Sequence, residues 1–344
     1  LGAQGDRRFN RVITDWCAGQ ARTLKREGRS SEAQAALTAA SAAYRQLLAA
    51  DDQPDPVLLL TAGRTLSDLG RHDEAAETLA KASASDPSNP FIWSNLCLAL
   101  SRGGRDEQAL DACGNALNLE PDNVLASTVT IRLLGRKGLW FEASDQAMNL
   151  LTRSVAELND SREVDPLVSA AGAVVDGLKT DGDNFTAGKV AGALGRFLSD
   201  RSRHDPAIDA LLQAVDLTPD NDNRWANLCL GYQRAGRATA ALESCRHALE
   251  INEEHFWARV MSAEILASGE QWPEALQQAR RAALSPPPSG GHTEVLIRFA
   301  NHATEAGFHG QACEMLPAIE NPDVEAIAGA LEELDCPDTG TAGR

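Results

Sequence analysis

The chain repeats one pattern every 34 residues, and this period constrains its fold more than any other feature of the sequence. In the clearest copy, residues 90–123, the apolar residues Trp93, Leu96 and Leu100 are spaced by three and four, so they lie on one face of a helix. Gly104 follows where that helix must end, because glycine adopts a positive φ without a steric penalty. The pattern therefore predicts a helix, a turn and a second helix.

The second helix of this copy carries small residues where it must approach the first. Ala109 and Ala116 are these residues, and Pro121 ends the unit because proline cannot continue a helix. The same spacing returns 34 residues earlier and later, and again in a second block after a break in the register. The copies lie near residues 14–55, 56–89, 90–123, 124–157, 188–221, 222–255, 256–289 and 293–323.

This spacing of apolar, small and glycine residues resembles the tetratricopeptide repeat, a helix–turn–helix unit of the same length. The resemblance covers most of residues 14–323. It implies an all-α fold, an α-solenoid of about eight stacked antiparallel helix pairs in a right-handed superhelix. The sequence has no β-branched run of period two and no apolar run of about 18 residues, so we expect neither a sheet nor a membrane-spanning helix.

The 34-residue register breaks in the middle of the chain, where residues 165–179 have the pattern of one amphipathic helix. The final helix, near residues 323–335, is acidic, as expected of a capping helix, whose outer face is exposed to water because no repeat follows it. The expected divisions are an N-terminal block at 7–157, an irregular inserted helix or elbow at 158–187, a C-terminal block with its capping helix at 188–336, and a disordered tail at 337–344.

The chain is strongly acidic, with a formal net charge of −17. Such a charge is unfavourable for binding nucleic acid, because phosphate contacts require clustered lysine and arginine, and equally for binding an anionic membrane surface. Residues 1–5 contain neither an initiator methionine nor a signal peptide. We therefore expect the chain to begin after a cleavage site or inside a longer protein.

Four of the seven cysteines occupy two fixed positions of the repeat, eight and twenty-four. These positions face each other in an antiparallel helix pair, which predicts disulfides inside single repeats. Two further cysteines, near the start of the last repeat's second helix and at the end of the capping helix, are expected to meet as well. The predicted pairs, and the cysteine left over, are Cys97–Cys113, Cys229–Cys245, Cys313–Cys336 and Cys17.

These disulfides would place the protein in an oxidising compartment, either a bacterial-type periplasm or the outside of the cell. The alternative is that each cysteine is simply a small buried residue, and that one repeat was duplicated with both of its cysteines. The similarity of residues 93–105 to residues 225–237 supports such a duplication. Free cysteines would leave a cytoplasmic location open.

No arrangement of residues typical of a catalytic site is present in the sequence. The segment from Gly182 to Val190 differs from a phosphate-binding loop in its spacing and lacks the serine or threonine that holds magnesium. His309 and Cys313 lie four residues apart on one helix face, but an exposed histidine beside a structural thiol is commoner than a metal site. We therefore predict no catalytic residue, no metal, no cofactor and no enzymatic activity.

The resemblance also implies a binding surface. In the family, the first helix of each pair lines a concave groove, chiefly through positions two, five, six, nine, twelve and thirteen. Here positions nine and thirteen are rich in arginine, whose planar fork pairs with carboxylates, and position six supplies asparagine. The predicted groove residues are Arg64, Asn95, Arg102, Arg132, Arg136, Arg196, Asn227 and Arg234. The alternative is that these arginines pair with acidic residues of a neighbouring repeat or stabilise helix ends.

The function expected from these features is a non-catalytic scaffold that binds a segment of another protein, possibly acidic, in an arginine-lined groove. Exposed apolar residues at position two, namely Phe91, Leu125 and Trp257, would anchor that partner. An alternative is a substrate-recruiting segment of a larger enzyme, such as a glycosyltransferase or a protease. A third is an array that polymerises through its ends.

Overall fold

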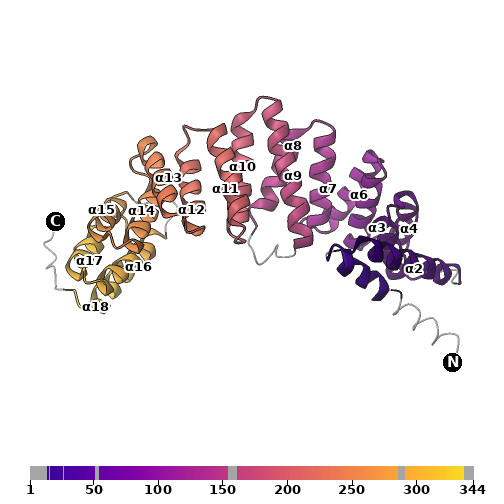
Figure 1. Cartoon of the computed structure of the whole chain (residues 1–344), viewed down its shortest axis with the longest axis horizontal. Coiled ribbons are helices and arrows are strands. Elements are labelled where there is room, and N and C mark those ends of the chain that lie inside the picture. Colours follow the sequence, from indigo (N-terminus) through magenta and orange to yellow (C-terminus); the bar gives the residue numbers. More distant parts are fainter. Residues whose placement is uncertain are drawn as a thin grey trace. The chain divides into compact units, whose positions relative to one another are not determined.

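The computed structural model describes residues 14, 16–25, 27–50, 54–153, 161–285 and 291–336, and these residues form helices without a strand (Figure 1). The predicted tail, 337–344, lies outside them, as do residues 154–157 of the predicted N-terminal block and residues 158–160 of the predicted insert. The helices are α2 Ser30–Ala49, α3 Pro56–Asp68, α4 His72–Ser85, α5 Pro90–Arg102, α6 Asp106–Leu119, α7 Val124–Arg136, α8 Trp140–Leu151, α9 Ser161–Thr180, α10 Asn184–Ser199, α11 His204–Leu217, α12 Asp222–Arg234, α13 Ala238–Ile251, α14 Phe256–Ser268, α15 Trp272–Ala283, α16 His292–Glu305, α17 His309–Met315, η1 Leu316–Ala318 and α18 Val324–Glu333.

The chain divides into two compact units, Leu1–Gly177 and Leu178–Arg344. Unit 1 contains the packed pairs α3/α4, α5/α6 and α7/α8, and unit 2 contains α10/α11, α12/α13, α14/α15 and α16/α17. In the sequence, α9 follows α8 and is longer than the helix predicted at 165–179. α18 packs against α16 and η1 at the end of unit 2. The predicted all-α array of antiparallel helix pairs is confirmed. The domain boundaries expected from the sequence remain a prediction.

The repeat pattern sets where the helices begin and end. The side chains of Asn89 and Asn123 precede α5 and α7 and accept hydrogen bonds from the backbone N–H groups of Phe91 and Ala126, at 3.1 and 2.9 Å. Each first helix in the clearest copies ends before a glycine of positive φ; Gly104, for example, has a φ of 75°. None of the helices in the described chain is long and apolar enough to cross a membrane.

Tryptophan at position four ties each of two first helices to the preceding repeat. The indole Nε1 of Trp93 donates a hydrogen bond to the carbonyl oxygen of Pro87 at 2.8 Å. Trp225 makes the same bond to Pro219, also at 2.8 Å. The proline that ends one repeat therefore supplies the acceptor that a half-buried tryptophan of the next repeat requires.

Positions eight and twenty-four face each other inside each helix pair. In α3/α4 and α10/α11 a glycine stands opposite a leucine. A Cβ atom on Gly63 would lie 2.5 Å from Cγ of Leu79, and one on Gly195 would lie 2.4 Å from Cγ of Leu211. The leucine thus fills the space that a side chain at position eight would need, and the two helices pack without a gap.

Cysteine fills the same two positions in α5/α6 and α12/α13. The structure bonds Cys97 to Cys113 and Cys229 to Cys245, with Cα atoms 5.1 and 5.2 Å apart. A third disulfide joins α17 to the residue after α18, where the Cα atoms of Cys313 and Cys336 are 5.5 Å apart. These are the three pairs that the sequence predicts, and Cys17 is free and half-buried. Each bond lies within one unit, and its role is to hold helices together.

The glycine–leucine contact predicts opposite effects for two Gly→Ala substitutions. Gly195→Ala forces a methyl group into Leu211 and should lower the free energy of unfolding by about 1–3 kcal/mol. Gly114 lies inside α6 with nothing near its missing side chain, so Gly114→Ala should stabilise the protein by about 0.5–1 kcal/mol. Urea denaturation followed by circular dichroism measures both; a neutral Gly195→Ala would contradict the contact.

Removing a disulfide should loosen one helix pair. The Cys229→Ala, Cys245→Ala double variant should lose about 3 kcal/mol, because the bond restricts a short loop of the unfolded chain. The difference from the wild type should vanish when both proteins are measured in dithiothreitol. Cys17→Ala serves as the control, and its denaturation midpoint should equal that of the wild type both with and without dithiothreitol. A wild-type midpoint that does not respond to dithiothreitol would contradict the bonds.

Candidate functional site

First helices lie side by side along each unit. α3 contacts α5 and α5 contacts α7 in unit 1, as α10 contacts α12 and α12 contacts α14 in unit 2. The second helices α4, α6 and α8, and likewise α11, α13 and α15, make no comparable contacts with one another. We call the outward side of these first helices the first-helix face. Its residues are Val57, Arg64, Phe91, Arg102, Leu125, Arg132 and Arg136 in unit 1 and Lys189, Arg196, Asn227, Arg234 and Trp257 in unit 2.

The arginines at position thirteen join successive repeats. Each donates to the serine at position twelve of the preceding repeat, so that one guanidinium group bridges two first helices. The bonds to serine Oγ are Arg102 to Ser67 at 3.2 Å, Arg136 to Ser101 at 2.8 Å and Arg234 to Ser199 at 3.2 Å. This arginine–serine pattern was not predicted, although both residues recur at fixed positions of the sequence.

Two of these arginines also form ion pairs with the preceding repeat. Arg136 lies 2.8 Å from Asp106, and Arg234 lies 2.5 Å from Asp200. That both line a ligand-binding groove stays a prediction, and each already has a carboxylate partner within the chain. Position thirteen lies beside the turn of the preceding repeat, so a carboxylate in or just after that turn reaches it. For these two residues the structure follows the alternative of a partner in a neighbouring repeat.

Arg132, at position nine of α7, is different. It makes no ion pair with any described residue, although its side chain is exposed. Packing around its guanidinium, and then the positive charges of Arg102 and Arg136, lower the pKa of Arg132. Arg102 also has no acidic partner in the described chain. The α5–α7 part of the first-helix face therefore gathers three guanidinium groups, of which one is neutralised.

The remaining predicted arginines at position nine divide between the units. Arg64 interacts with another residue of the chain and is half-buried. Arg196, on α10, is exposed and lies close enough to Arg224 for its charge to lower the pKa of that residue, after the larger effect of burial. The sequence analysis missed Arg224, because position three of the repeat is not among the positions that line the family's groove.

The two asparagines at position six differ in availability. The Nδ2 atom of Asn95 donates to the backbone carbonyl oxygen of Phe91 at 2.6 Å, so one of its two N–H groups is used within α5. Asn227 has a buried Nδ2 atom without a hydrogen-bond partner. Of the two, Asn227 has the Nδ2 atom that no described residue satisfies.

Asn227 lies in a hollow on the first-helix face of unit 2. The hollow has a volume of about 260 Å³ and is formed by α12, α14 and α16. Trp257, Val260 and Met261 supply its apolar lining, with Trp257 40% exposed. Glu264 stands among the polar lining groups and is held by Gln233 and Arg298, at 3.2 and 3.4 Å.. The shape suits an apolar side chain with adjacent main-chain groups.

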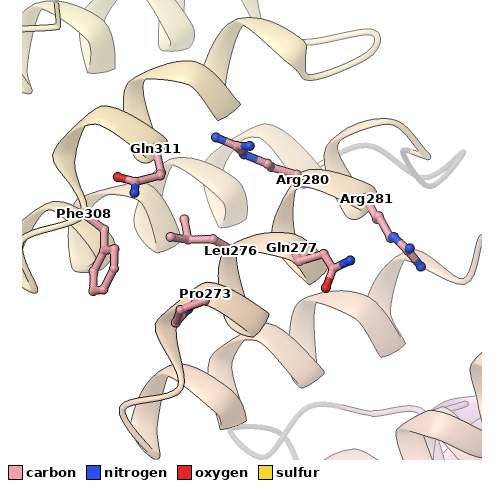
Figure 2. A pocket seen from close by; sticks show the side chains of 7 residues that line it. All are labelled: Pro273, Leu276, Gln277, Arg280, Arg281, Phe308 and Gln311. Atoms are coloured by element: carbon pink, nitrogen blue, oxygen red, sulfur yellow. The ribbon is translucent and has the colours of Figure 1, made fainter.

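A second hollow, of about 300 Å³, lies between α15 and α17. Figure 2 shows the side chains of Arg280 and Arg281 at this hollow extending in different directions and not converging on one point. Arg280 forms an ion pair with Glu314, and Arg281 lies 4.0 Å from Glu253. The cations here are engaged by the chain itself, and the hollow is a groove between neighbouring second helices.

Three potential metal ligands meet at the end of unit 2. One ring nitrogen of His309 and the sulfur atoms of Cys313 and Cys336 lie within 4.8 Å of one another. Both sulfur atoms belong to a disulfide, whereas metal binding requires thiolates. His309 Nε2 lies 2.7 Å from the carbonyl oxygen of Leu334 and 3.6 Å from Sγ of Cys313. In this oxidised form the cluster serves as a structural link.

Comparison with known protein families matches residues 58–89 to the tetratricopeptide repeat. The comparison with curated proteins gives no match. The match covers α3 and α4, the pair that carries the glycine–leucine contact.

Several solved structures are similar to this chain. Pseudomonas aeruginosa pilF is 17% identical, with a TM-score of 0.37, over 72% of this chain and 98% of its own. YrrB, described as a TPR protein with an unusual peptide-binding site, is 18% identical, with a TM-score of 0.32, over 75% of this chain and 99% of its own. The C-terminal part of a TPR repeat-containing protein from Cytophaga hutchinsonii is 14% identical, with a TM-score of 0.39, over 78% and 98%. At these values the likenesses carry no inference about function.

The hollow in unit 2 contains a histidine whose titration should affect stability. His255 caps α14 through its Nδ1 atom, 3.2 Å from the N–H nitrogen of Ala258. Burial lowers the pKa of His255, and Asp222 opposes this shift only in part. As the pH falls below about 6.5, the unfolded chain binds a proton that the folded chain does not, so stability should decrease.

We expect the His255→Asn variant to show a smaller loss between pH 7 and pH 5, because asparagine retains a capping oxygen and does not titrate. Urea denaturation midpoints measured across this range test the expectation. Identical pH dependence in the wild type and the variant would contradict it.

Proposed function

Because this chain belongs to the tetratricopeptide repeat family, we propose that it is a non-catalytic scaffold whose first-helix face binds an extended acidic segment of another protein. The observation that carries this proposal is the cluster of Arg102, Arg132 and Arg136. Three guanidinium groups lie together there, one of them paired with Asp106, on a chain whose formal net charge is −17. A carboxylate-bearing segment would relieve their repulsion and use the bidentate geometry of arginine.

Apolar residues supply the second part of the proposed binding surface. Val57 and Phe91 occupy position two of α3 and α5 and are 48% and 59% exposed. Positions two, nine and thirteen are separated by seven and four residues, so they follow one another along the same helix face. A segment lying across α3, α5 and α7 would then meet apolar groups near the helix starts and arginines near the helix ends. Exposed aromatic residues commonly provide much of the energy of such contacts.

The three disulfides support a location in which they persist, such as a bacterial-type periplasm or the outside of the cell. The acidic net charge supports a protein partner in preference to nucleic acid.

A charge reversal at Arg132 tests the proposal. The probe is a fluorescein-labelled peptide of ten glutamates, titrated with the protein and followed by fluorescence anisotropy at low salt. Arg132→Glu should weaken binding at least about tenfold, equivalent to about 1.4 kcal/mol, because it removes one cation and repels the probe. A peptide of ten lysines with the same label serves as the charge-reversed control probe.

The control variant is Arg105→Glu, which makes the same charge change in the same unit. Arg105 is exposed and lies before α6, and among the described residues its side chain bonds only to Gln108. It should bind the glutamate peptide nearly as well as the wild type. Equal weakening by both variants would mean that overall charge governs binding, and no binding by the wild type would refute the proposed acidic ligand.

A further inference from the structure

Unit 2 contains a buried arginine that the chain does not neutralise. Arg224, the third residue of α12, is 9% exposed, and its Nε atom is enclosed without a hydrogen-bond partner. No ion pair to its side chain occurs in the described part of unit 2. Buried charges in proteins are ordinarily paired and hydrogen-bonded, because an unpaired charge is costly to desolvate. Arg224 departs from this rule.

The other buried arginine of unit 2 shows what the chain does when it satisfies such a group. Arg259 is 5% exposed, and its Nε atom is also enclosed without a partner, but its Nη atoms donate to Oε1 of Gln278 at 3.2 Å and to the carbonyl oxygen of Glu253. The carboxylate of Glu253 also lies 3.9 Å away. Arg224 has none of these partners, so its terminal N–H groups remain available.

The guanidinium group of Arg224 lies against Gly192 of α10. A Cβ atom on Gly192 of α10 would lie 3.1 Å from Nη1 of Arg224 and 3.5 Å from its Cζ atom. The guanidinium therefore packs against the bare backbone of α10. One turn further along α10 stands Arg196, which also makes no ion pair with a described residue. Arg196 and Arg224, two arginines without an ion pair, therefore lie near each other on the first-helix face of unit 2.

We infer that Arg196 and Arg224 form a binding site for an oxyanion, a carboxylate or phosphate group, seated beside Gly192. Two arginine forks offer several N–H donors to the oxygens of such a group, and the like charges favour an anion between them. Lys189 lies three residues before Gly192 and seven before Arg196 on α10, and so adds a third positive charge on the same helix face.

This inference deepens the proposed function, because it assigns a specific anion anchor to the first-helix face of unit 2. It rests on contacts inside unit 2 and not on the arginine cluster of unit 1. A small-anion titration therefore tests it separately. Failure of the glutamate peptide to bind unit 1 would leave this site standing, and failure of this site would leave the peptide result unchanged.

The test uses the full chain labelled with ¹⁵N and titrated with sodium phosphate or sodium acetate at pH 7.5, with sodium chloride holding the ionic strength constant. Arginine Nε–Hε signals in NMR spectra report binding at individual guanidinium groups. We expect saturable shifts of the Arg224 signal, assigned by its loss in Arg224→Gln. Saturation by phosphate alone would identify a phosphate site, and saturation by both anions a general oxyanion site that also takes carboxylates.

Two variants separate the site from general effects on folding. Gly192→Ala keeps every charge but places a methyl group against Nη1, so it should raise the phosphate dissociation constant at least about tenfold. Arg237→Gln removes an arginine of unit 2 that lies outside the first-helix face and pairs with Asp205, and it should leave the constant unchanged. Circular dichroism checks that both variants are folded. A wild type without saturable shifts, or a folded Gly192→Ala protein that binds like the wild type, would overturn the site.

Discussion

The contact between position eight of the first helix and position twenty-four of the second sets how closely each helix pair packs. The chain fills it with complementary residues: Gly63 with Leu79, Cys97 with Cys113, and Gly195 with Leu211. In each case the combined side chains occupy a similar space, so the pairs keep one geometry while the residues change. Every repeat can then present its first helix in the same way. The position of each arginine on the first-helix face depends on this regularity.

Much of the fold follows from the sequence, because repeat proteins place equivalent residues in equivalent environments. The spacing of Trp93, Leu96, Leu100 and Gly104 predicts a helix and its end, and the structure has them as α5 and the turn after it. The facing of positions eight and twenty-four predicts which cysteines meet. Helix α9 begins earlier than predicted, at Ser161, and Pro166 lies inside it. The predicted helix start lies beside this proline, because proline is usual in the first turn of a helix.

The sequence predicted which positions lie on the proposed binding face, but not which of their side chains have partners within the chain. Arg132 and Arg136 are both arginines of the same repeat, yet only Arg136 finds a carboxylate, because Asp106 follows the turn beside it. Asn95 and Asn227 occupy the same position, but only Asn95 bonds to its own helix. Arg224 has no signal in the repeat pattern, since its importance depends on Gly192 in another helix. Such pairings depend on three-dimensional neighbours and not on the period.

The two disulfides at positions eight and twenty-four lie within single helix pairs and never join one pair to the next. In each of them the two bonded cysteines are 16 residues apart in the sequence. If the chain were stretched from its ends, a pair such as α3/α4 would lengthen to the full extent of its backbone. The bonded pairs α5/α6 and α12/α13 would stop short, because the residues between their cysteines cannot extend. Tension would therefore lengthen these helix pairs in steps of two sizes, and reduction would convert the shorter steps into the longer ones.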